Sequence, residues 1–371
     1  MPRRIALALI FAVLALVGPD DAGAQGSGPW LRDLSFPTNM AFAADGRLFF
    51  TEKSTGQVRV VTRAGALLDE PFVTVPVLDA SETGLLGVAL HPRFDEGQPW
   101  VYLYRSDPAS GMNEVLRIRA EGDRAVGQPE LLLATVPATN VYHNGGDMTF
   151  GPDGHLYVTV GEAHQAERAQ DPSDPGGKVL RLTPEGEPAS GNPFGDDLGA
   201  FTIGHRNSFG ICVDPATGDL WETENGPPKE HDEVNRIVAG GNYGWPELTG
   251  DSGGRYEDPV ASFDRTVVPT GCAWWRGELY VGEYANERVV SVDPSSGEVS
   301  EAFPLDAGVT DLQVGPDGSL YVATTDAIWR LTSPSASTGG RGAYGIIAVL
   351  AAVVMGGALV VRAWAGRGAR S

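Results

Sequence analysis

The sequence predicts an all-β fold, a six-bladed β-propeller that carries an N-terminal signal peptide and a C-terminal transmembrane helix. Three observations predict it. The 371 residues include 49 Gly and 27 Pro, so turns are frequent and short strands are favoured over long helices. A turn-and-strand unit recurs along the middle of the chain. An apolar stretch lies close to each terminus, outside these repeats.

The repeated unit is a tight turn followed by an apolar strand. In its clearest copies Asp-Gly supplies the positive φ angles that a hairpin turn needs, and alternating apolar residues follow. Units spaced by roughly 40 to 65 residues fit four-stranded blades around an axis, whereas a β-sandwich gives no reason for six similar units. The copies occupy residues 44–51, 90–104, 152–159, 217–221, 276–281 and 316–322, of which the second is the weakest.

Residues 1–24 have the pattern of a secretory signal peptide. Arg3 and Arg4 form a charged start, a continuous apolar stretch follows from Ile5 to Val17, and an Ala-Gly-Ala cleavage site ends the segment. The apolar stretch is short for a membrane span, and an uncleaved N-terminal anchor is the alternative. The exported propeller is therefore expected to occupy residues 25–332.

The C-terminal end has the length and charge pattern of a membrane anchor. No charged residue occurs between Tyr344 and Val361, and about 20 apolar residues cross a bilayer, so we expect a transmembrane helix over residues 343–361. Arginines follow in residues 362–371, which predicts a cytoplasmic tail. The protein is then a single-pass protein of the cell membrane with an extracytoplasmic propeller, periplasmic or at the cell surface. Residues 333–342 predict a flexible stalk, although a C-terminal sorting signal removed after export would look similar.

Charge excludes one class of partner. The chain has 48 acidic and 27 basic residues, a formal charge of −21, and a surface this acidic repels the phosphates of nucleic acid. Residues 25–361 alone hold 46 acidic and 22 basic residues, hence −24. Such a surface suits the binding of cations such as Ca²⁺, or is simply that of a soluble acidic protein.

The two cysteines exclude a disulfide-rich scaffold and a zinc cluster built from Cys. Cys212 and Cys272 fall in predicted strands of neighbouring blades. A disulfide between them and two buried thiols are both open, and export favours the disulfide.

Four loop segments contain polar residues that turn formation alone does not require. Propellers bind ligands on the axis, where the loops of all blades converge, so we expect the chemistry in these segments. They lie at residues 142–147, 161–164, 203–210 and 224–227, and the last is followed by polar stretches at 232–235 and 240–246.

Four motifs resemble those of the soluble quinoprotein glucose/sorbosone dehydrogenases, which include the aldose sugar dehydrogenases. They are GLLGVALHP at 84–92, HNGG at 143–146, GHRN at 204–207 and GNYGWP at 241–246. The resemblance spans roughly residues 37–331. It implies a six-bladed propeller, in agreement with the repeat count. It also implies a reaction that oxidises the C1 hydroxyl of an aldose to the lactone with pyrroloquinoline quinone (PQQ) and Ca²⁺.

The resemblance implies catalytic roles for three residues. His143 resembles the general base that takes the proton of the sugar hydroxyl, a step that suits a neutral imidazole. Glu162 stands where the family usually has an Asp that orients this His. Arg206 and Asn207 match residues that contact the quinone, and a cation such as Arg206 would stabilise the charge that develops as hydride arrives.

Other positions match the cofactor and substrate sites of the family. The backbone carbonyls of Gly226 and Pro227 match Ca²⁺ ligands, and Ca²⁺ accepts such oxygens readily. Thr266 aligns with a Thr that contacts the cofactor. Glu82 stands where the glucose enzymes have a Gln near the substrate. His205, inside the third motif, is expected to be a packing residue.

Three cations of the family are missing from this chain. The glucose enzymes hold the PQQ carboxylates with a Lys and a pair of Arg, which align here with Ala285, Gly308 and Thr310. PQQ is a tricarboxylate, and each charge-assisted hydrogen bond that is lost would cost roughly 1.5–3 kcal/mol of affinity. Arg288 would compensate if the loop register differs from this alignment.

Two main hypotheses follow. The first is a PQQ- and Ca²⁺-dependent aldose dehydrogenase, anchored in the membrane by its C-terminal helix, that passes electrons to a membrane acceptor. The second is a non-catalytic propeller of the same fold that has lost the cofactor and binds a protein or a glycan. A Ca²⁺-dependent lactonase, also six-bladed, is a third hypothesis, and it would need acidic and Asn side chains around an axial metal.

The predicted topology can be tested on intact cells. Protease added outside the cells, or to spheroplasts if there is an outer membrane, should release the propeller because an exposed flexible stalk is readily cut. Immunoblotting of the medium and of the cell pellet measures the release. Full protection of the chain would contradict the topology.

Overall fold

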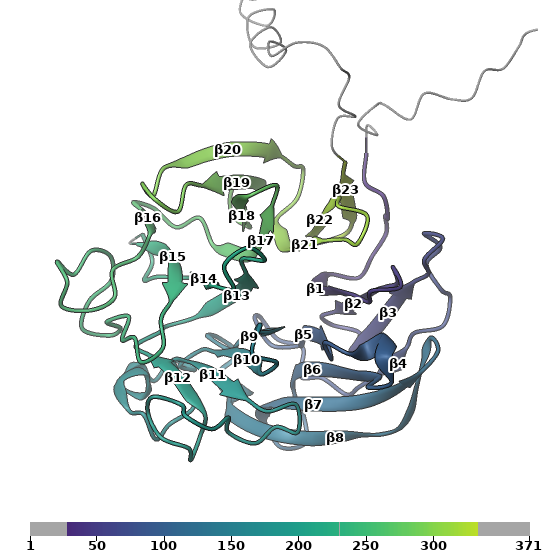
Figure 1. Ribbon diagram of the computed structural model, residues 1–371, viewed down its shortest axis with the longest axis horizontal. Coiled ribbons are helices and arrows are strands. Elements are labelled where there is room, and N and C mark those ends of the chain that lie inside the picture. Colours follow the sequence, from purple (N-terminus) through teal and green to yellow (C-terminus); the bar gives the residue numbers. More distant parts are fainter. Residues whose placement is uncertain (1–27, 230, 333–371) are drawn as a thin grey trace, which may run out of the picture. The chain divides into compact units, whose positions relative to one another are not determined.

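The computed structural model describes residues 28–229 and 231–332, which form six sheets around a central axis (Figure 1). Within these residues no helix has the length and apolar character to cross a membrane. The predicted signal peptide (1–24), stalk (333–342), transmembrane helix (343–361) and tail (362–371) lie outside the described residues and stay predictions.

Each sheet is one blade, whose strands follow one another in the sequence and pair antiparallel. The first blade consists of β1 (Pro37–Phe42), β2 (Leu48–Glu52), β3 (Gln57–Val61) and β4 (Val73–Thr74). The second consists of β5 (Leu85–Leu90), β6 (Trp100–Ser106), β7 (Met112–Glu121) and β8 (Arg124–Pro137). The third consists of β9 (Gly145–Phe150), β10 (Leu156–Val160), β11 (Lys178–Leu182) and β12 (Ala200–Ile203).

The other three blades repeat this plan. The fourth consists of β13 (Ser208–Val213), β14 (Leu220–Glu224), β15 (Asp232–Ile237) and β16 (Ala261–Phe263). The fifth consists of β17 (Pro269–Trp275), β18 (Glu278–Glu283), β19 (Arg288–Val292) and β20 (Val299–Pro304). The sixth consists of β21 (Val309–Val314), β22 (Leu320–Thr324) and β23 (Ile328–Leu331). Short 3₁₀ segments lie at Phe94–Glu96, Ala138–Asn140 and Ala166–Gln170.

The predicted repeat is the hairpin between the first and second strands of each blade, so the count of six blades is confirmed. The glycines of the Asp-Gly turns adopt the left-handed conformation that the sequence predicts, with φ of 96° at Gly46, 78° at Gly154 and 75° at Gly318. The same local turn chemistry therefore starts the first, third and sixth blades.

The apolar core lies between neighbouring blades. Every residue of β2, β10, β14 and β22 is buried, because both faces of these strands pack against other structure. Between the first two blades Phe49 contacts Phe72 and Phe94 edge-on, with ring centroids 5.4 and 5.6 Å apart. Such aromatic pairs add about 0.5–1.5 kcal/mol each beyond their burial.

The ring is closed by residues that precede the first blade. The first strands of the six blades contact one another in succession around the axis, and β21 contacts β1. The sixth blade has three strands of its own, and Leu31 pairs antiparallel with Ile328 of β23 through N–O distances of 3.0 and 3.1 Å. The two ends of the described domain thus share one blade, so opening the ring requires breaking this pairing.

A disulfide joins two neighbouring blades. Cys212 of β13 is bonded to Cys272 of β17, and their Cα atoms lie 5.7 Å apart. This resolves the choice that the sequence left between a disulfide and two thiols. The bond closes a loop of some 60 residues and so restricts the unfolded chain as well as the folded one.

A buried polar network joins the first strands across the axis. Asp147 of β9 accepts hydrogen bonds from the side-chain amide of Asn39 in β1 at 2.9 Å and from the backbone N–H of Ile211 in β13 at 2.7 Å. Asn39 in turn accepts the N–H of Val88 in β5 at 2.8 Å. Burial raises the pKa of Asp147 to about 7. Burial, and after it the charge of Asp147, also raises the pKa of Asp311 in β21 well above its ordinary value.

The raised pKa of Asp147 makes the stability depend on pH. The folded protein keeps this proton up to about pH 7, whereas the unfolded chain loses it near the ordinary value of 3.8, so the folded state binds the extra proton between these values. The free energy of unfolding should therefore fall as the pH rises from about 5 to about 8, by up to about 1.4 kcal/mol per pH unit below pH 7. Denaturant unfolding across this range measures the slope.

The matched variant for this experiment is Asp147→Asn. It removes one titrating group and should make the slope shallower by up to about 1.4 kcal/mol per pH unit. Burial also raises the pKa values of Glu222, Glu224 and Glu233, so these groups maintain part of the slope. The substitution should also lower stability at the acidic end, because the Asn side chain has one acceptor oxygen whereas both oxygens of Asp147 accept hydrogen bonds. The same slope in both proteins would contradict the assignment to Asp147.

Candidate functional site

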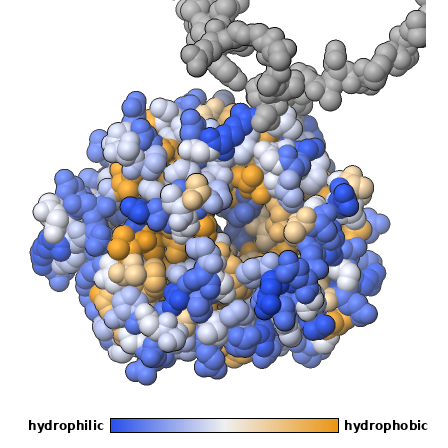
Figure 2. Space-filling view, in the orientation of Figure 1, coloured by the Kyte–Doolittle hydropathy of each residue, from blue (hydrophilic) through white to orange (hydrophobic). Residues whose placement is uncertain are grey.

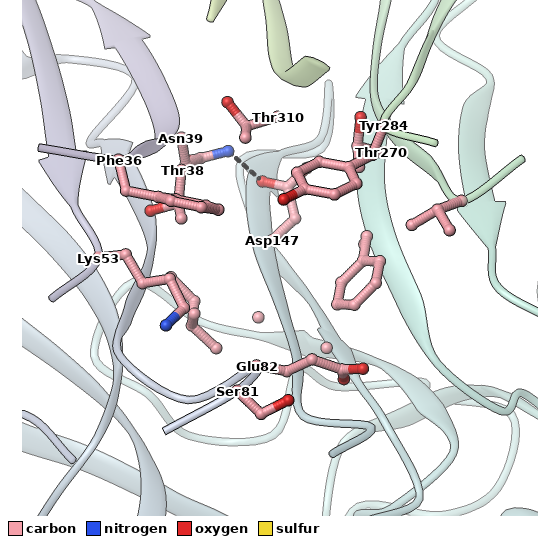
Figure 3. Close-up of a pocket in the computed structure, with 15 residues that line it drawn as sticks. Phe36, Thr38, Asn39, Lys53, Ser81, Glu82, Asp147, Thr270, Tyr284 and Thr310 are labelled. Atoms are coloured by element: carbon pink, nitrogen blue, oxygen red, sulfur yellow. Dashed lines mark hydrogen bonds between the residues drawn. The ribbon is translucent and has the colours of Figure 1, made fainter. Parts of the chain in front are cut away.

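A cavity of about 310 Å³ opens on the axis between the first strands of the blades. Figure 2 shows the surface hollowed at the centre of the ring. Phe36, Phe209 and Tyr284 give the cavity flat apolar walls. Polar side chains also line it, and Figure 3 labels Thr38, Asn39, Lys53, Ser81, Glu82, Asp147, Thr270 and Thr310. The volume lies at the lower end of the range of roughly 300–1,000 Å³ that small-molecule sites have.

The topology of the blades brings the predicted site residues to one edge of the ring. In antiparallel strands the start of the first strand lies beside the end of the second. Glu82, His143 and Arg206 precede the first strands of their blades, whereas Glu162 and Gly226 follow the second strands of theirs. Residues that are widely separated in the sequence therefore meet at this edge.

His143 and Glu162 are in direct contact. The Nδ1 atom of His143 lies 2.6 Å from Oε1 of Glu162, and both side chains are buried. The other carboxylate oxygen of Glu162 accepts the N–H of Gln165 at 2.6 Å, which fixes the carboxylate. His143 has a left-handed backbone with φ of 56°, so its position costs strain that the surrounding contacts must hold. The length of the Glu162 side chain therefore permits its direct pairing with His143.

Glu82 connects two of the polar loops. Its Oε2 atom accepts the backbone N–H of His143 at 2.7 Å and the side-chain amide of Asn207 at 3.1 Å. The Oδ1 atom of Asn207 accepts the N–H of Gly145 at 3.2 Å, and its side chain is buried. Glu82 also lines the axial cavity. One carboxylate thus holds the HNGG and GHRN segments together at the cavity.

Arg206 is held from three sides. Its backbone N–H donates to Oε1 of Glu224, and its Nη1 donates to the carbonyl of Asn225 at 2.8 Å. Its guanidinium lies 5.5 Å from the ring centroid of Trp245 in the GNYGWP motif. Burial lowers the pKa of Arg206 from its ordinary value, although a guanidinium stays charged at neutral pH.

The loop that follows β14 contains the backbone carbonyl groups of Gly226 and Pro227. Within residues 28–229 and 231–332, no hydrogen bond reaches the backbone oxygens of Gly226 or Pro227. The loop is fixed by Asp232, whose Oδ1 accepts the N–H of Gly226 at 2.9 Å and whose Oδ2 accepts the N–H of Val268 at 2.8 Å. Burial raises the pKa of Asp232. Thr266 lies beside this loop and accepts a backbone N–H from it at 2.9 Å.

Ala285, Gly308 and Thr310, the residues that align with the missing Lys and Arg pair, are uncharged. Ala285 donates its backbone N–H to the carbonyl of Val267 at 3.0 Å. At Gly308 an added Cβ would lie 2.7 Å from the ring of Tyr284, so the ring occupies the space of a side chain. Thr310 lines the cavity, and its buried hydroxyl has no hydrogen-bond partner among the described residues.

Arg288 does not replace the missing cations. Its guanidinium is bound to Glu283 at 2.7 Å and to Glu301 at 3.0 Å, within its own blade. The register of β18 and β19 pairs Glu283 with Arg288. The slip that would bring Arg288 to the cofactor positions is therefore not observed.

His205 belongs to a buried group inside the fourth blade. His205, Glu222 and Glu224 bring possible metal-ligand atoms within 4.8 Å of one another. Both nitrogens of His205 already have partners, Glu224 at 2.9 Å and Thr202 at 2.8 Å, and its ring stacks on Tyr243. These contacts agree with the packing role expected for His205.

Several residues of the cavity wall were not identified from the sequence. Phe36, Asn39, Lys53, Asp147 and Tyr284 line the cavity without belonging to the site residues taken from the resemblance. The position in the repeat could have identified two of them, Lys53 and Tyr284, as residues of this edge. Lys53 and Tyr284 each come directly after the last residue of a second strand, which is the edge where Glu162 also lies.

Sequence comparisons identify relatives over most of the chain. The profile of the family described as Glucose / Sorbosone dehydrogenase matches residues 34–332. The aldose sugar dehydrogenase YliI of Escherichia coli K12 is 29% identical over 337 residues, which cover 81% of this chain and 90% of that protein. Quinoprotein glucose dehydrogenase B of Acinetobacter calcoaceticus is 30% identical over 272 residues, 64% of this chain and 56% of that protein.

Solved structures resemble the propeller as a whole. An oxidoreductase of Thermus thermophilus, described as a glucose dehydrogenase, has a TM-score of 0.77 at 38% identity and covers 82% of this chain and 99% of its own. The PQQ-bound aldose sugar dehydrogenase of Streptomyces coelicolor has a TM-score of 0.75 at 29% identity and covers 84% of this chain and 99% of its own. The resemblance inferred from the four motifs is confirmed.

The bridging role of Glu82 can be tested by stability alone. Glu82→Ala leaves the buried N–H of His143 and the amide of Asn207 without their acceptor, which should lower the free energy of unfolding by about 1–3 kcal/mol. Glu82→Gln keeps an oxygen that can accept both bonds and should cost less. Denaturant unfolding of the two variants measures the difference, and a Glu82→Ala protein as stable as wild type would show that the bridge contributes nothing.

Proposed function

Because the chain belongs to the glucose/sorbosone dehydrogenase family, we propose that it oxidises the C1 hydroxyl of an aldose to the lactone with PQQ and Ca²⁺. The observation that carries the proposal is the contact of 2.6 Å between His143 and Glu162 beside the axial cavity. A buried imidazole oriented by a carboxylate is the arrangement that a general base requires.

The pairing assigns a role to each ring nitrogen of His143. With Nδ1–H donated to Glu162, the neutral imidazole has its lone pair on Nε2, which accepts the proton of the sugar hydroxyl. The carboxylate of Glu162 then stabilises the imidazolium that forms. Because Glu82 binds the backbone of His143, the base is fixed on its main chain as well as on its ring.

The residues present fit the implied cofactors at several points. The backbone carbonyls of Gly226 and Pro227 suit Ca²⁺, which binds such oxygens. The flat walls and the unpaired hydroxyl of Thr310 suit an aromatic ligand with polar substituents. Arg206, Asn207 and Thr266 would hold the quinone. When bound, PQQ would accept the hydride from C1, and Ca²⁺ would increase its electrophilic character.

Glu82 would contact the substrate. Its Oε2 receives both bonds from the protein, which leaves Oε1 to accept a hydroxyl group of the sugar. A carboxylate at this place disfavours anionic sugars such as uronic acids or sugar phosphates, because like charges repel. The proposed substrate class is therefore neutral aldoses.

A second candidate is a non-catalytic propeller that binds a protein or a glycan. The uncharged residues Ala285, Gly308 and Thr310 favour it, since they weaken the expected hold on the PQQ carboxylates. A lactonase with an axial metal has less support, because both oxygens of Asp147 already accept bonds from Asn39 and Ile211.

We further propose that the enzyme is anchored in the membrane with its propeller outside the cytoplasm. Uncharged residues from Tyr344 to Val361 and the arginines after them support this location. An anchor would keep the site close to a membrane electron acceptor.

Reconstitution of the propeller tests the activity. Protein with PQQ and Ca²⁺ should reduce a redox dye when aldoses are supplied, and removal of Ca²⁺ by a chelator should abolish the reduction. His143→Ala should lower kcat by about 10²- to 10⁴-fold, the usual contribution of a general base, while PQQ binding persists.

His155→Ala is the control for this variant. His155 lies in the hairpin turn between β9 and β10, at the opposite edge of the blade, so its loss should leave kcat unchanged. Equal turnover in His143→Ala and wild type would remove His143 from the mechanism. Wild-type protein that neither reduces the dye nor binds PQQ would favour the non-catalytic propeller.

A further inference from the structure

The axial cavity has one cation in its wall. Among the described residues that line it, Lys53 is the single basic side chain. Arg206 is not among the residues that line the cavity, and Arg288 is paired with Glu283 and Glu301. Lys53 is therefore the basic group best placed to meet an anionic ligand in this cavity.

The position of Lys53 is structurally defined. Its Nζ lies 3.0 Å from Oδ1 of Asp79 and 5.7 Å from the ring centroid of Phe36, and its side chain is 12% exposed. Its stem passes over Gly84, where an added Cβ would lie 2.6 Å from Cγ of Lys53. The first glycine of the GLLGVALHP motif therefore leaves the space through which the lysine reaches the cavity. Figure 3 shows the side chain in the wall, with Glu82 and Ser81 nearby.

The repeat relates this lysine to the blade that lacks its expected cation. Glu52 ends β2 and pairs with Pro37, and Glu283 ends β18 and pairs with Pro269. The residues that come next, Lys53 and Tyr284, hold equivalent positions in the first and fifth blades, and both line the cavity. Ala285, where the family has its lysine, follows Tyr284 directly. A basic residue thus stands at the same edge of the ring, on a different blade.

A second polar group in the wall lacks a partner. Thr310 is 9% exposed, and its Oγ1 makes no hydrogen bond within the described residues. A buried hydroxyl without a partner costs free energy unless a ligand or water satisfies it. The lysine and the threonine reach the cavity from the first and sixth blades, which are neighbours in the ring.

We propose that Lys53 is the residue that holds a carboxylate of the quinone cofactor in this chain, with the hydroxyl of Thr310 as a second donor. This rests on the proposed function, in which PQQ is the cofactor. An ammonium forms a charge-assisted hydrogen bond with a carboxylate, the strong kind that the missing Lys and Arg pair would have formed. The cation of the site is then supplied by the first blade instead of the fifth and sixth.

Equilibrium binding of PQQ tests this without reference to turnover. Dialysis of the purified propeller against PQQ with excess Ca²⁺, with free PQQ measured by absorbance, gives the Kd. Lys53→Met should raise the Kd by about 10- to 100-fold, and Lys53→Arg should restore most of the affinity. The Kd of wild type should also rise with salt more steeply than that of Lys53→Met. Thr310→Val should weaken binding by a smaller factor.

Asp79→Asn separates cofactor binding from a structural role of the ion pair. If Lys53 binds the cofactor, loss of its competitor Asp79 leaves the affinity for PQQ unchanged or tighter. If the pair only holds the loops, Asp79→Asn and Lys53→Met should weaken binding alike, and that result would overturn the proposal. Thermal unfolding of each variant confirms that the propeller is folded.

Lys229→Met is the matched control. Lys229 is an exposed lysine beside Thr266, outside the cavity wall, and its loss should leave the Kd as in wild type. Weaker binding in Lys229→Met with no change in Lys53→Met would assign the carboxylate to Lys229 and refute the role of Lys53. Wild-type protein that does not bind PQQ at all would overturn the proposed function, a result distinct from binding that is independent of Lys53.

Discussion

The buried carboxylate of Asp147 is the contact on which the axis of the propeller depends. It joins β9 to β1 through Asn39 and to β13 through the backbone of Ile211, while Asn39 reaches on to β5. Its oxygens are satisfied only when these first strands are at the correct distance from the axis. The cavity wall that contains Asp147 therefore has a defined shape before any ligand binds. Because burial raises the pKa of Asp147 to about 7, the folded protein keeps this group protonated below that pH.

The chemistry of the site follows from this defined edge. Glu82, His143 and Asn207 come from the starts of three different blades, yet one oxygen of Glu82 binds both of the others. The second strand of the third blade ends at the same edge and brings Glu162 to His143. Local strand geometry thus delivers the side chains, and the contacts between loops orient them. This preorganisation is what the proposed proton transfer would require, because a general base must be held within hydrogen-bond reach of its substrate.

Charge distinguishes this propeller from the pattern of the family. Residues 25–361 carry 46 acidic and 22 basic residues, and the proposed cofactor site lacks three basic residues that the resemblance implies. A tricarboxylate needs a local positive charge in such a surrounding. Lys53 supplies such a charge, and its ammonium is paired with Asp79 and lies 5.7 Å from the ring centroid of Phe36. The same acidic surface, which is expected to repel nucleic acid, also sets the main electrostatic demand on the proposed cofactor site.

The sequence by itself determined the six blades, because Asp-Gly turns and the strands beside them depend on neighbouring residues. The resemblance likewise pointed to His143, Glu162, Arg206 and Gly226, which lie at one edge of the ring. Only the tertiary structure decided that Cys212 is bonded to Cys272, that Leu31 closes the ring on Ile328, and that Lys53 lines the cavity. These contacts depend on which segments of different blades meet when the ring closes, and no local sequence pattern encodes the distances between blades.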